Sequence, residues 1–286
     1  MKVGYCVPVV PAMASYRLRV AIPMRHIGCP AVIGTGDPTF FYKHQAGDPD
    51  RALDLLHDGR SVVYDVVNNH FGGPPLGDHY RAMCDMATVI TAGSEAMAAR
   101  VKACTGRDAK VIPDPYENAE CAPATVGMGV LWFGHSANVR SLLKHLDALD
   151  VPGTDFVVCS NIEQATVRWT RDAEDECLRA SAVVCLTSDN PGASENRVVK
   201  AIRAGRFVVM PDDCAESWRA FAPYAWIGDV REGIQWALNN REEACNKIAA
   251  GQKYIRERFG PMMIGMQWRA LFDSILAAET SASRDG

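Results

Sequence analysis

The feature that most constrains the fold is a regular alternation of apolar runs of strand length with amphipathic stretches of helical length. In the first half, strands are predicted at 3–10, 31–34, 61–67, 88–91 and 110–112, and helices at 16–27, 51–57, 80–86 and 95–104. In the second half, strands are predicted at 129–133, 155–159, 182–186 and 207–210, and helices at 139–149, 173–180, 195–204, 230–239, 241–259 and 262–278. Alternating βα units of this kind predict an α/β protein with parallel sheets covered by helices on both faces.

The alternation is interrupted once, in a proline-containing stretch that begins at Pro113-Asp114-Pro115 and runs to Gly127 without a long apolar run. A chain of 286 residues is long enough for two domains of ~150 residues. We therefore expect a first domain at 1–125, a second at 126–258, and a terminal helix and tail at 259–286. Packing of that helix back on the first domain is one arrangement that the sequence allows.

The bulk composition argues against several classes of protein. The chain has 48% hydrophobic and 22% charged residues, which is typical of a globular protein. Its net charge of -4 does not indicate a nucleic-acid partner. Its ten cysteines are scattered and lack the spacing of a zinc site, so we expect no metal site. We expect them to be free thiols in a reducing compartment, the cytoplasm. No apolar run approaches the ~20 residues of a membrane span, so integral membrane association is not expected.

The first candidate site follows the predicted strand 182–186. A tight Pro191-Gly192 loop there precedes a predicted helix start. Helix N-termini bind phosphate through free amides and the helix dipole, and Glu195 can accept hydrogen bonds from vicinal hydroxyls such as those of a ribose. A plain helix cap with a solvated Glu is the alternative interpretation. The candidate binding residues of this segment are Gly192, Ala193, Ser194, Glu195, Asn196 and Arg197.

A second candidate site follows the predicted strand 129–133, where glycine and small polar residues again precede a helix. This loop can hold a diphosphate, with charge from His135 or Arg140; an ordinary βα loop capped by Asn138 is the alternative. Neither a G-x-G-x-x-G motif after the first strand nor a P-loop motif is present, which disfavours a dinucleotide fold or a P-loop NTPase. The candidate binding residues are Gly134, His135, Asn138 and Arg140.

Two further segments carry candidate chemistry in the first half. Asp65 and His70 lie at the end of the predicted strand 61–67, and a histidine there can accept a proton from an attacking hydroxyl, so both are candidate catalytic residues. A turn is the alternative interpretation. Arg17 and Arg19 begin the first predicted helix and can meet a phosphate of a donor or an acceptor. A solvated basic face would give the same pattern.

Taken in order, four stretches resemble the large family of retaining glycosyltransferases with the GT-B fold, which has two Rossmann-like domains facing a cleft. They are 14–19 at the first helix, 91–97 with 111–115 ("V-S-E-x-L … V-I-P-N"), 131–134 at the opening strand of the donor domain, and 194–209 at the donor-binding helix ("E-A-x-A-x-G-x-P-V-V"). The resemblance implies that Glu195 holds the donor ribose and that the amides from Gly192 to Ser194 face sugar or diphosphate. It also implies a metal-independent reaction with retention at the sugar carbon and no cofactor besides a nucleotide-sugar donor, UDP- or GDP-linked.

The chain also departs from the family pattern. Where the family often has a Glu that touches the donor sugar, ahead of the ribose Glu, this chain has Thr187. The acceptor stays open: a small molecule, a glycan or a modified DNA base would each fit. The alternatives to an ordinary glycosyltransferase are an enzyme that glycosylates hydroxymethylated DNA bases, a nucleotide-sugar epimerase, and an inactive nucleotide-sugar-binding subunit.

Overall fold

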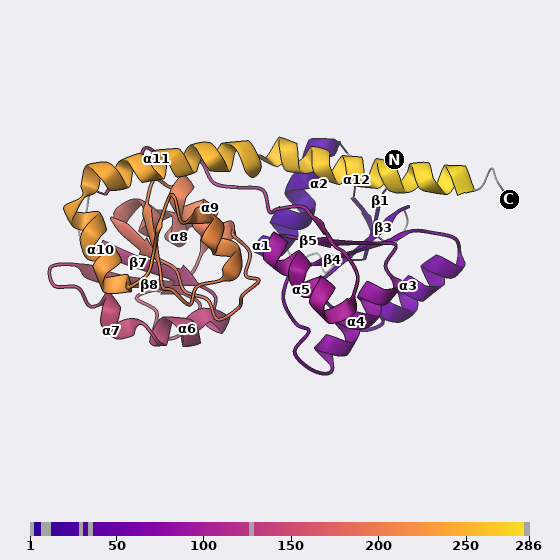
Figure 1. Cartoon of the computed structure of the whole chain (residues 1–286), viewed down its shortest axis with the longest axis horizontal. Helices are drawn as coiled ribbons and strands as arrows, with labels where there is room; N and C mark the ends of the chain where they lie inside the picture. The colour runs from indigo at the N-terminus through magenta and orange to yellow at the C-terminus, as the bar shows by residue number, and fades with distance from the viewer. Residues whose placement is uncertain (1–2, 7–12, 29–30, 34–36, 126–128, 283–286) are drawn as a thin grey trace. The chain divides into compact units, whose positions relative to one another are not determined.

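The chain divides into two units in a computed structural model that describes residues 3–6, 13–28, 31–33, 37–125 and 129–282 (Figure 1). Unit 1 consists of Met1–Glu117 together with Arg258–Gly286, and unit 2 is Asn118–Glu257. The first boundary lies a few residues before the expected position at 125. Parts of the strands expected at 3–10 and 31–34 fall outside the described residues.

Unit 1 is built on a six-stranded sheet in which every pair of neighbouring strands is parallel. The strand order is β2-β1-β3-β4-β5-β6. The strands are β1 (Val3–Cys6), β2 (Ala31–Ile33), β3 (Thr39–Tyr42), β4 (Val62–Val66), β5 (Val89–Ala92) and β6 (Lys110–Val111). The strand β3 was not predicted, although its aromatic residues favour strand.

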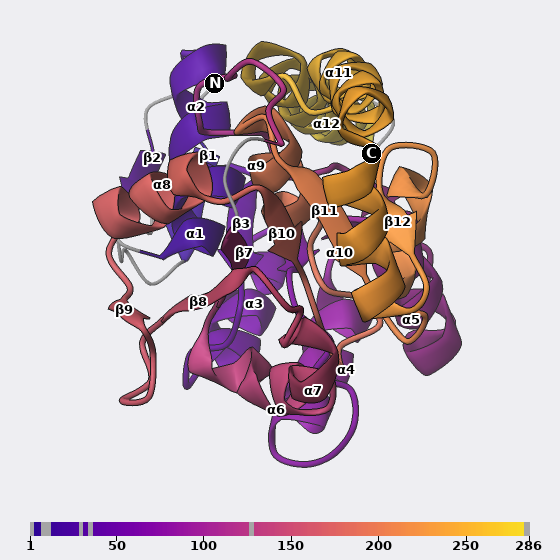
Figure 2. The ribbon, with the colours of Figure 1, turned by 90° about the vertical axis from the view of Figure 1, so that its left-hand side faces the viewer.

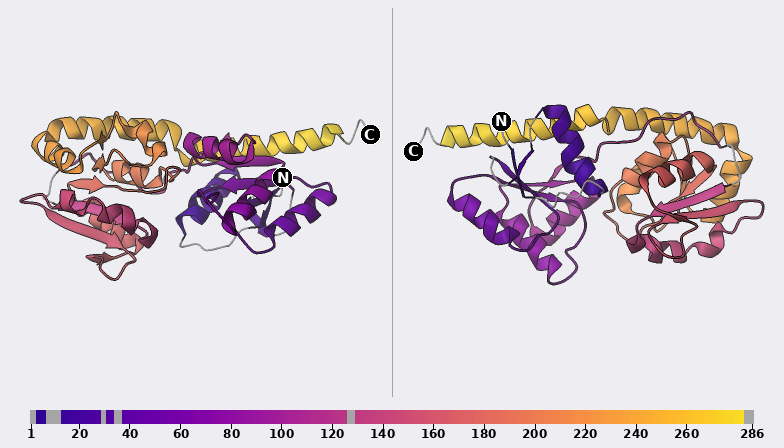
Figure 3. Two further views of the ribbon diagram at one scale, coloured as in Figure 1. Left: turned by 60° about the horizontal axis from the view of Figure 1, so that its bottom comes forward. Right: turned by 180° about the vertical axis from the view of Figure 1, so that it is seen from behind.

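Helices cover both faces of this sheet. Because side chains alternate along a strand, Tyr64 of β4 packs with α3, α4 and α5, whereas the adjacent Val63 packs with η1, α2 and α12. Figure 3 shows α2 and α12 on the same face. The helices of unit 1 are α1 (Ala14–Tyr16), η1 (Arg17–Ala21), α2 (Ile22–Ile27), α3 (Asp48–His57), α4 (Leu76–Met86), α5 (Glu95–Thr105) and α12 (Pro261–Ala282).

The first helical segment runs from α1 through α2 without a break, as the expected helix at 16–27 requires. Its middle section, η1, is a π-helical turn, and Pro23 follows at the start of α2. Proline lacks the amide that an α-helix interior needs, and a wider π turn is one way in which a helix accommodates this local irregularity.

The C-terminal helix α12 belongs to the core of unit 1. Trp268 is fully buried and its ring meets the ring of Phe40 edge-on, with centroids 5.2 Å apart. Ile264 and Phe272, from the same helix, are also fully buried in this cluster. The residues of α12 thus complete one face of a sheet whose strands come from the beginning of the chain.

Unit 2 repeats the architecture with a second six-stranded parallel sheet in the order β12-β11-β10-β7-β8-β9 (Figure 2). The strands are β7 (Gly129–Gly134), β8 (Asp155–Ser160), β9 (Val167–Arg168), β10 (Val183–Cys185), β11 (Phe207–Met210) and β12 (Trp226–Ile227). The helices are η2 (Ser136–Asn138), α6 (Val139–Leu143), α7 (Leu146–Leu149), α8 (Arg171–Ala180), α9 (Asn196–Arg203), η3 (Glu216–Phe221), α10 (Val230–Asn239) and α11 (Arg241–Arg258).

Each sheet has one point at which the direction of the connections reverses. In unit 2 the chain leaves β7 toward β8 and leaves β10 toward β11, although β7 and β10 are neighbours. In unit 1 the same reversal lies between β1 and β3. In open parallel sheets ligands bind at the carboxyl ends of the strands at this switch point, so these two places are where a site is expected.

Among the described residues, no helix combines the length and apolar character needed to cross a membrane. The eight cysteines from Cys84 to Cys245 are free thiols. Burial raises the pKa of the Cys84, Cys159 and Cys185 thiols to about 12, so these groups act as small apolar core residues rather than as nucleophiles.

Candidate functional site

Arg197 bridges the two strands that flank the switch point of unit 2. Its Nη1 donates a hydrogen bond to the carbonyl oxygen of Phe133, at the end of β7, at 3.2 Å. Its Nη2 donates to the carbonyl oxygen of Thr187, just beyond β10, at 2.9 Å. The guanidinium also stacks over the Trp218 ring, 4.9 Å from its centroid. The first turn of α9 thus places a cation at the carboxyl ends of both strands.

The charge of this guanidinium is not balanced by an ion pair within the described part of the chain. Burial lowers the pKa of Arg197 to about 10, and the nearby Glu174 and Cys185 offset this only in part. The group therefore carries its charge at neutral pH, in a half-buried position where its bonding partners are two neutral carbonyls. A half-buried cation without a counterion favours an anionic ligand, because such a ligand recovers part of the cost of desolvation.

Gly134 makes room for the guanidinium. A Cβ at this position would lie 2.9 Å from Arg197 Nη1 and 3.0 Å from the Trp132 ring. The first distance is shorter than real Cβ contacts and the second is tighter than most, so a side chain at position 134 would displace the end of Arg197 from its present position.

The loop before α9 is held by hydrogen bonds within itself. The Gly192 amide donates to Asn190 Oδ1 at 3.1 Å, and the Ala193 amide donates to the Asn190 carbonyl at 3.1 Å. The amides of Gly192 and Ala193 are therefore committed to Asn190, and the expectation that they face the donor is corrected on this ground. From the other side, Trp218 Nε1 donates to the Ser194 carbonyl at 3.0 Å.

Ser194 and Glu195 both lie at the start of α9. The Ser194 hydroxyl accepts a hydrogen bond from the Asn196 amide at 3.1 Å, so it satisfies the first amide of the helix. Glu195 is half-buried at the N-cap position, and its carbonyl accepts the first helical hydrogen bond from Val199 at 2.9 Å. Glu195 thus precedes Arg197 by two residues at the start of α9.

The family motif places its Glu directly before the Ala of "E-A-x-A-x-G", and in this chain Lys200 stands there, before Ala201. The Lys200 ammonium lies 2.6 Å from Glu174 Oε1 and 2.9 Å from Asp175 Oδ1 and so ties α9 to α8. Aligned in this way, the motif does not identify Glu195 as the residue that binds the ribose. That assignment rests on the position of Glu195 at the start of α9.

Thr187, where the family often has a Glu, is fully buried. Its Oγ1 accepts a hydrogen bond from Trp132 Nε1 at 3.0 Å and lies 3.0 Å from Ser141 Oγ. Ser141 Oγ donates its single hydrogen to the Asn138 carbonyl at 2.7 Å, so Thr187 supplies the hydrogen between the two hydroxyls. Every polar group in this chain of bonds is satisfied, and Thr187 has an internal structural role.

The segment from the end of β7 to the start of α6 holds His135 and Arg140. The exposed His135 accepts a hydrogen bond at Nδ1 from the Ala137 amide at 3.2 Å and thereby caps the turn η2. Asn138 contributes its carbonyl to the bond from Ser141, not a side-chain cap. Arg140 is exposed and has no ion-pair partner in the described segments. Arg140 is therefore available to a ligand, and the exposed His135, which accepts at Nδ1, can still donate through Nε2.

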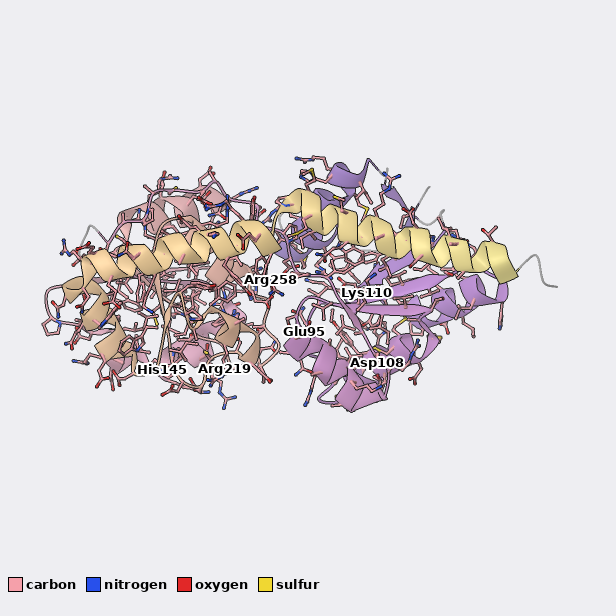
Figure 4. All side chains as sticks on the ribbon, turned by 45° about the horizontal axis from the view of Figure 1, so that its top comes forward. Glu95, Asp108, Lys110, His145, Arg219 and Arg258 are labelled. Carbon is pink, nitrogen blue, oxygen red and sulfur yellow. The ribbon has the colours of Figure 1, made fainter. Side chains whose placement is uncertain are left out.

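The edge of this region is fixed by the loop after β11. His145 Nε2 lies 3.2 Å from Asp213 Oδ1, and Arg219 Nη2 donates to the Asp212 carbonyl at 2.5 Å. Figure 4 labels both His145 and Arg219 on unit 2. These contacts hold the loop that leads into η3, the element that carries Trp218.

In unit 1, the expected roles of Asp65 and Arg19 are corrected. Both are buried, and Arg19 donates to Asp65 through Nε at 2.8 Å and through Nη2 at 2.5 Å. Thr91 Oγ1 donates to the same carboxylate at 2.7 Å. Burial alone would lower the pKa of Arg19, but Asp65 and Asp114 raise it above its ordinary value. The pair is therefore a buried structural element of unit 1.

Arg17 and His70 lie apart from that pair. Arg17 forms a two-pronged ion pair with Glu117 at 2.8 Å through both Nε and Nη2. His70 is exposed after β4 and packs edge-on against Tyr80, with ring centroids 5.3 Å apart. Tyr80 belongs to the cluster on the α4 face, opposite the face of Arg19, so the structure does not bring Asp65 and His70 together.

Sequence reasoning missed a group of polar residues that follow β3. Lys43, His44 and Asp48 lie in the loop to α3 and at its first turn, and His79 on α4 joins them. They were missed because β3 itself was missed. The aromatic run at 40–42, which follows Pro38, is the signal that could have located it. No group of three or more His, Cys, Asp or Glu in the described residues is arranged to hold a metal ion.

Several solved structures share this two-sheet architecture. Anabaena HepE in complex with UDP superposes with a TM-score of 0.72 at 14% identity, over 96% of this chain and 100% of that one. A glycosyltransferase from Rickettsia africae gives 0.71 at 9% identity, over 96% and 98%. The chain has the GT-B fold. The expected fold of two Rossmann-like domains is thereby confirmed.

An epimerase shares the same fold less closely. UDP-GlcNAc 2-epimerase from Neisseria meningitidis, bound to UDP-GlcNAc, gives a TM-score of 0.58 at 10% identity, over 97% and 100% of the two chains. No protein-family model matches the sequence, and no curated protein matches it. At these identities the likeness concerns the GT-B fold alone.

Proposed function

We propose that this chain is a glycosyltransferase that takes a sugar from a nucleotide-sugar donor bound to unit 2. The observation that carries the proposal is the Arg197 guanidinium, which lies at the carboxyl ends of β7 and β10 and has no ion-pair partner among the residues that the structure describes. A diphosphate group is the part of a nucleotide-sugar that this cation fits. Arg140, exposed in the first turn of α6, supplies a second positive charge for it.

The remainder of the donor is assigned from the same loop. Glu195 accepts hydrogen bonds from the ribose hydroxyls, and the donor is UDP- or GDP-linked. The solved structures of HepE in complex with UDP and with UDP-glucose support a uridine nucleotide as the first choice. No cofactor besides the donor enters this proposal.

The chemistry follows from the position of the charges. The bond between the sugar carbon and the diphosphate oxygen breaks, and a bond from the same carbon to an acceptor hydroxyl oxygen forms. The acceptor hydroxyl gives up its proton to the departing diphosphate. Arg197 and Arg140 stabilise the negative charge that grows on the departing diphosphate. Retention at the sugar carbon and independence of a metal ion are part of the proposal and rest on the family resemblance.

The binding test uses two matched glycine variants at opposite ends of β7. A Cβ at Gly134 collides with Arg197, whereas a Cβ at Gly129 meets no atom closer than 3.8 Å. Titration calorimetry should show that Gly134→Ala weakens binding of UDP or GDP at least tenfold, with Gly129→Ala close to wild type. If neither nucleotide binds the wild type, or if Gly134→Ala binds as tightly as wild type, the donor site is wrongly placed.

The reaction test uses the bound nucleotide-sugar. Incubation with and without a panel of acceptors, followed by NMR of the products, distinguishes transfer from the alternatives. Transfer produces nucleoside diphosphate together with a glycoside whose anomeric configuration reports retention, and EDTA leaves the rate unchanged. Conversion of the donor to its epimer in the absence of acceptor would instead identify an epimerase.

A further inference from the structure

Arg206 is a buried cation directly before β11, at the opposite end of the unit 2 sheet from Arg197. It is 7% exposed. Its Nη1 donates to the Ala124 carbonyl at 3.2 Å and its Nη2 to the Arg179 carbonyl at 2.9 Å. Its Nε is buried and has no hydrogen-bond partner. The guanidinium is always charged, so within the described part of the chain it lacks both a counterion and one acceptor.

The segment 118–125 brings a thiol to the turn that carries Arg206. The Cys121 amide donates to the Arg203 carbonyl at 2.8 Å, and the Ala124 amide donates to the Gly205 carbonyl at 2.9 Å. Gly205 has a φ of 76°, and a Cβ there would lie 3.1 Å from the Cys121 carbonyl oxygen. The turn and the segment therefore pack closely, and Cys121 is held beside the turn.

A second thiol comes from α11, which packs against the same turn. Gln252 of this helix donates from Nε2 to the Cys121 carbonyl at 2.8 Å and to the Ile202 carbonyl at 3.1 Å. Cys245 precedes Gln252 by seven residues, which is about two helical turns, so the two lie on the same face of α11. Cys121 and Cys245 are both partly exposed free thiols.

The two thiols are the acidic groups that face the buried cation. Burial lowers the pKa of Arg206, and the nearby Cys121 and Cys245 act in the opposite direction and raise it. A cation beside a thiol favours the thiolate, which is the nucleophilic form of cysteine. Cys121 and Cys245 are also open to solvent, unlike the fully buried Cys185, so a reagent can reach them.

We propose that Cys121 and Cys245 form a modification site for peroxides, in which Arg206 is the cation that favours the thiolate. The thiolate sulfur attacks one peroxide oxygen, the O–O bond breaks, and hydroxide leaves. The sulfur loses two electrons and becomes a sulfenic acid, and the peroxide gains them. The oxygen added to the sulfur gives the Arg206 Nε hydrogen the acceptor that it lacks. This site does not depend on the proposed transfer reaction.

The first test ranks the thiols of the wild-type chain. The full chain is treated with limiting hydrogen peroxide at neutral pH in the presence of dimedone, which traps sulfenic acids. Mass spectrometry of the digested chain then measures the label at each cysteine. Cys121 and Cys245 should be labelled about tenfold faster than Cys104, a partly exposed thiol on α5. Labelling of either thiol no faster than that of Cys104 would overturn the proposal.

The second test removes the cation. Arg206→Gln should slow labelling of Cys121 and Cys245 about tenfold, because the fraction of thiolate falls, and should leave Cys104 unchanged. Arg179→Gln is the matched control, since it removes an exposed charge and keeps the carbonyl that Arg206 binds, and it should be labelled as the wild type is. A folded Arg206→Gln protein that is labelled at the wild-type rate contradicts the proposal. If Arg206→Gln does not fold, the ranking in the wild-type chain decides.

Discussion

Arg19 and Asp65 form a solvent-excluded ion pair with two hydrogen bonds, at 2.8 Å and 2.5 Å, between the first helical segment and β4. Removing Asp65 leaves the buried Arg19 cation with only the longer ion pair to Asp114, at 3.4 Å. Asp65→Ala should therefore lower the free energy of unfolding by about 3–5 kcal/mol. Urea unfolding followed by circular dichroism measures this. A stable Asp65→Ala protein that has lost only turnover would instead support the catalytic role predicted from the sequence.

Arg140 is expected to act on the ligand and not on the fold. Arg140→Ala should weaken UDP binding about tenfold and reduce its dependence on salt, because one charge contact with the diphosphate is lost. The thermal midpoint should stay at the wild-type value, since Arg140 is exposed. Arg100→Ala, another exposed arginine, on α5, serves as the control for a general loss of positive charge. Equal effects of the two substitutions would contradict a specific contact.

Glu195 can be tested against one part of the donor. If its carboxylate accepts hydrogen bonds from the ribose, Glu195→Gln should weaken binding of UDP several-fold and weaken binding of 2′-deoxy-UDP less. The reason is that the deoxy nucleotide has already lost one of the hydroxyls concerned. Parallel calorimetric titrations of the two nucleotides provide the comparison. The same loss of affinity for both would show that Glu195 does not contact the ribose.

Thr187 should not accept the family's Glu. Because its side chain is fully buried and hydrogen-bonded to Trp132 and Ser141, Thr187→Glu would bury a carboxylate without a counterion. We expect severe destabilisation and no gain in turnover. Thr187→Val, which keeps the shape and leaves Trp132 Nε1 without an acceptor, should cost about 1–3 kcal/mol in urea unfolding. Higher activity in Thr187→Glu would show that this position faces the sugar after all.

Asp48 and His79, in the group of polar residues that follow β3, have opposite effects on the stability of the fold when the pH is lowered. The pKa of Asp48 in the folded state, about 6, lies above its ordinary value of 3.8, so protonation from about pH 6 downward stabilises the fold. The pKa of His79, about 4, lies below its ordinary value of 6.5, so the unfolded chain takes up that proton first and acidification over the same range destabilises the fold.

Substitution separates the two effects. Asp48→Asn should lose stability on acidification from about pH 6.5 to 4, whereas His79→Gln should gain stability over the same range. Urea unfolding at intervals across this range gives both profiles. If the free energy of unfolding of both variants changed with pH as that of the wild type does, the surroundings would shift the pKa of neither group.

The sequence predicted the sheets better than the side-chain roles, for a physical reason. Apolar runs such as Val62–Val66 report burial directly, and the order of the βα units then places the carboxyl ends. Whether a polar side chain at such an end faces solvent or the core depends on contacts made across the sheet. Asp65 could not be recognised as internal before its partner Arg19 was known. Likewise, the sequence alone does not single out His79, because its neighbours His44 and Asp48 are brought beside it by β3 and α3.

The return of α12 to unit 1 has a consequence for the order of folding during synthesis. Unit 2 consists of one continuous stretch and has all its residues once Glu257 has been made. Unit 1 begins first but cannot close its second face until Trp268, Phe272 and Ile275 have been added. On the ribosome, therefore, the apolar surface of the earlier segment stays uncovered while the later one folds, and the last helix to emerge completes the first core.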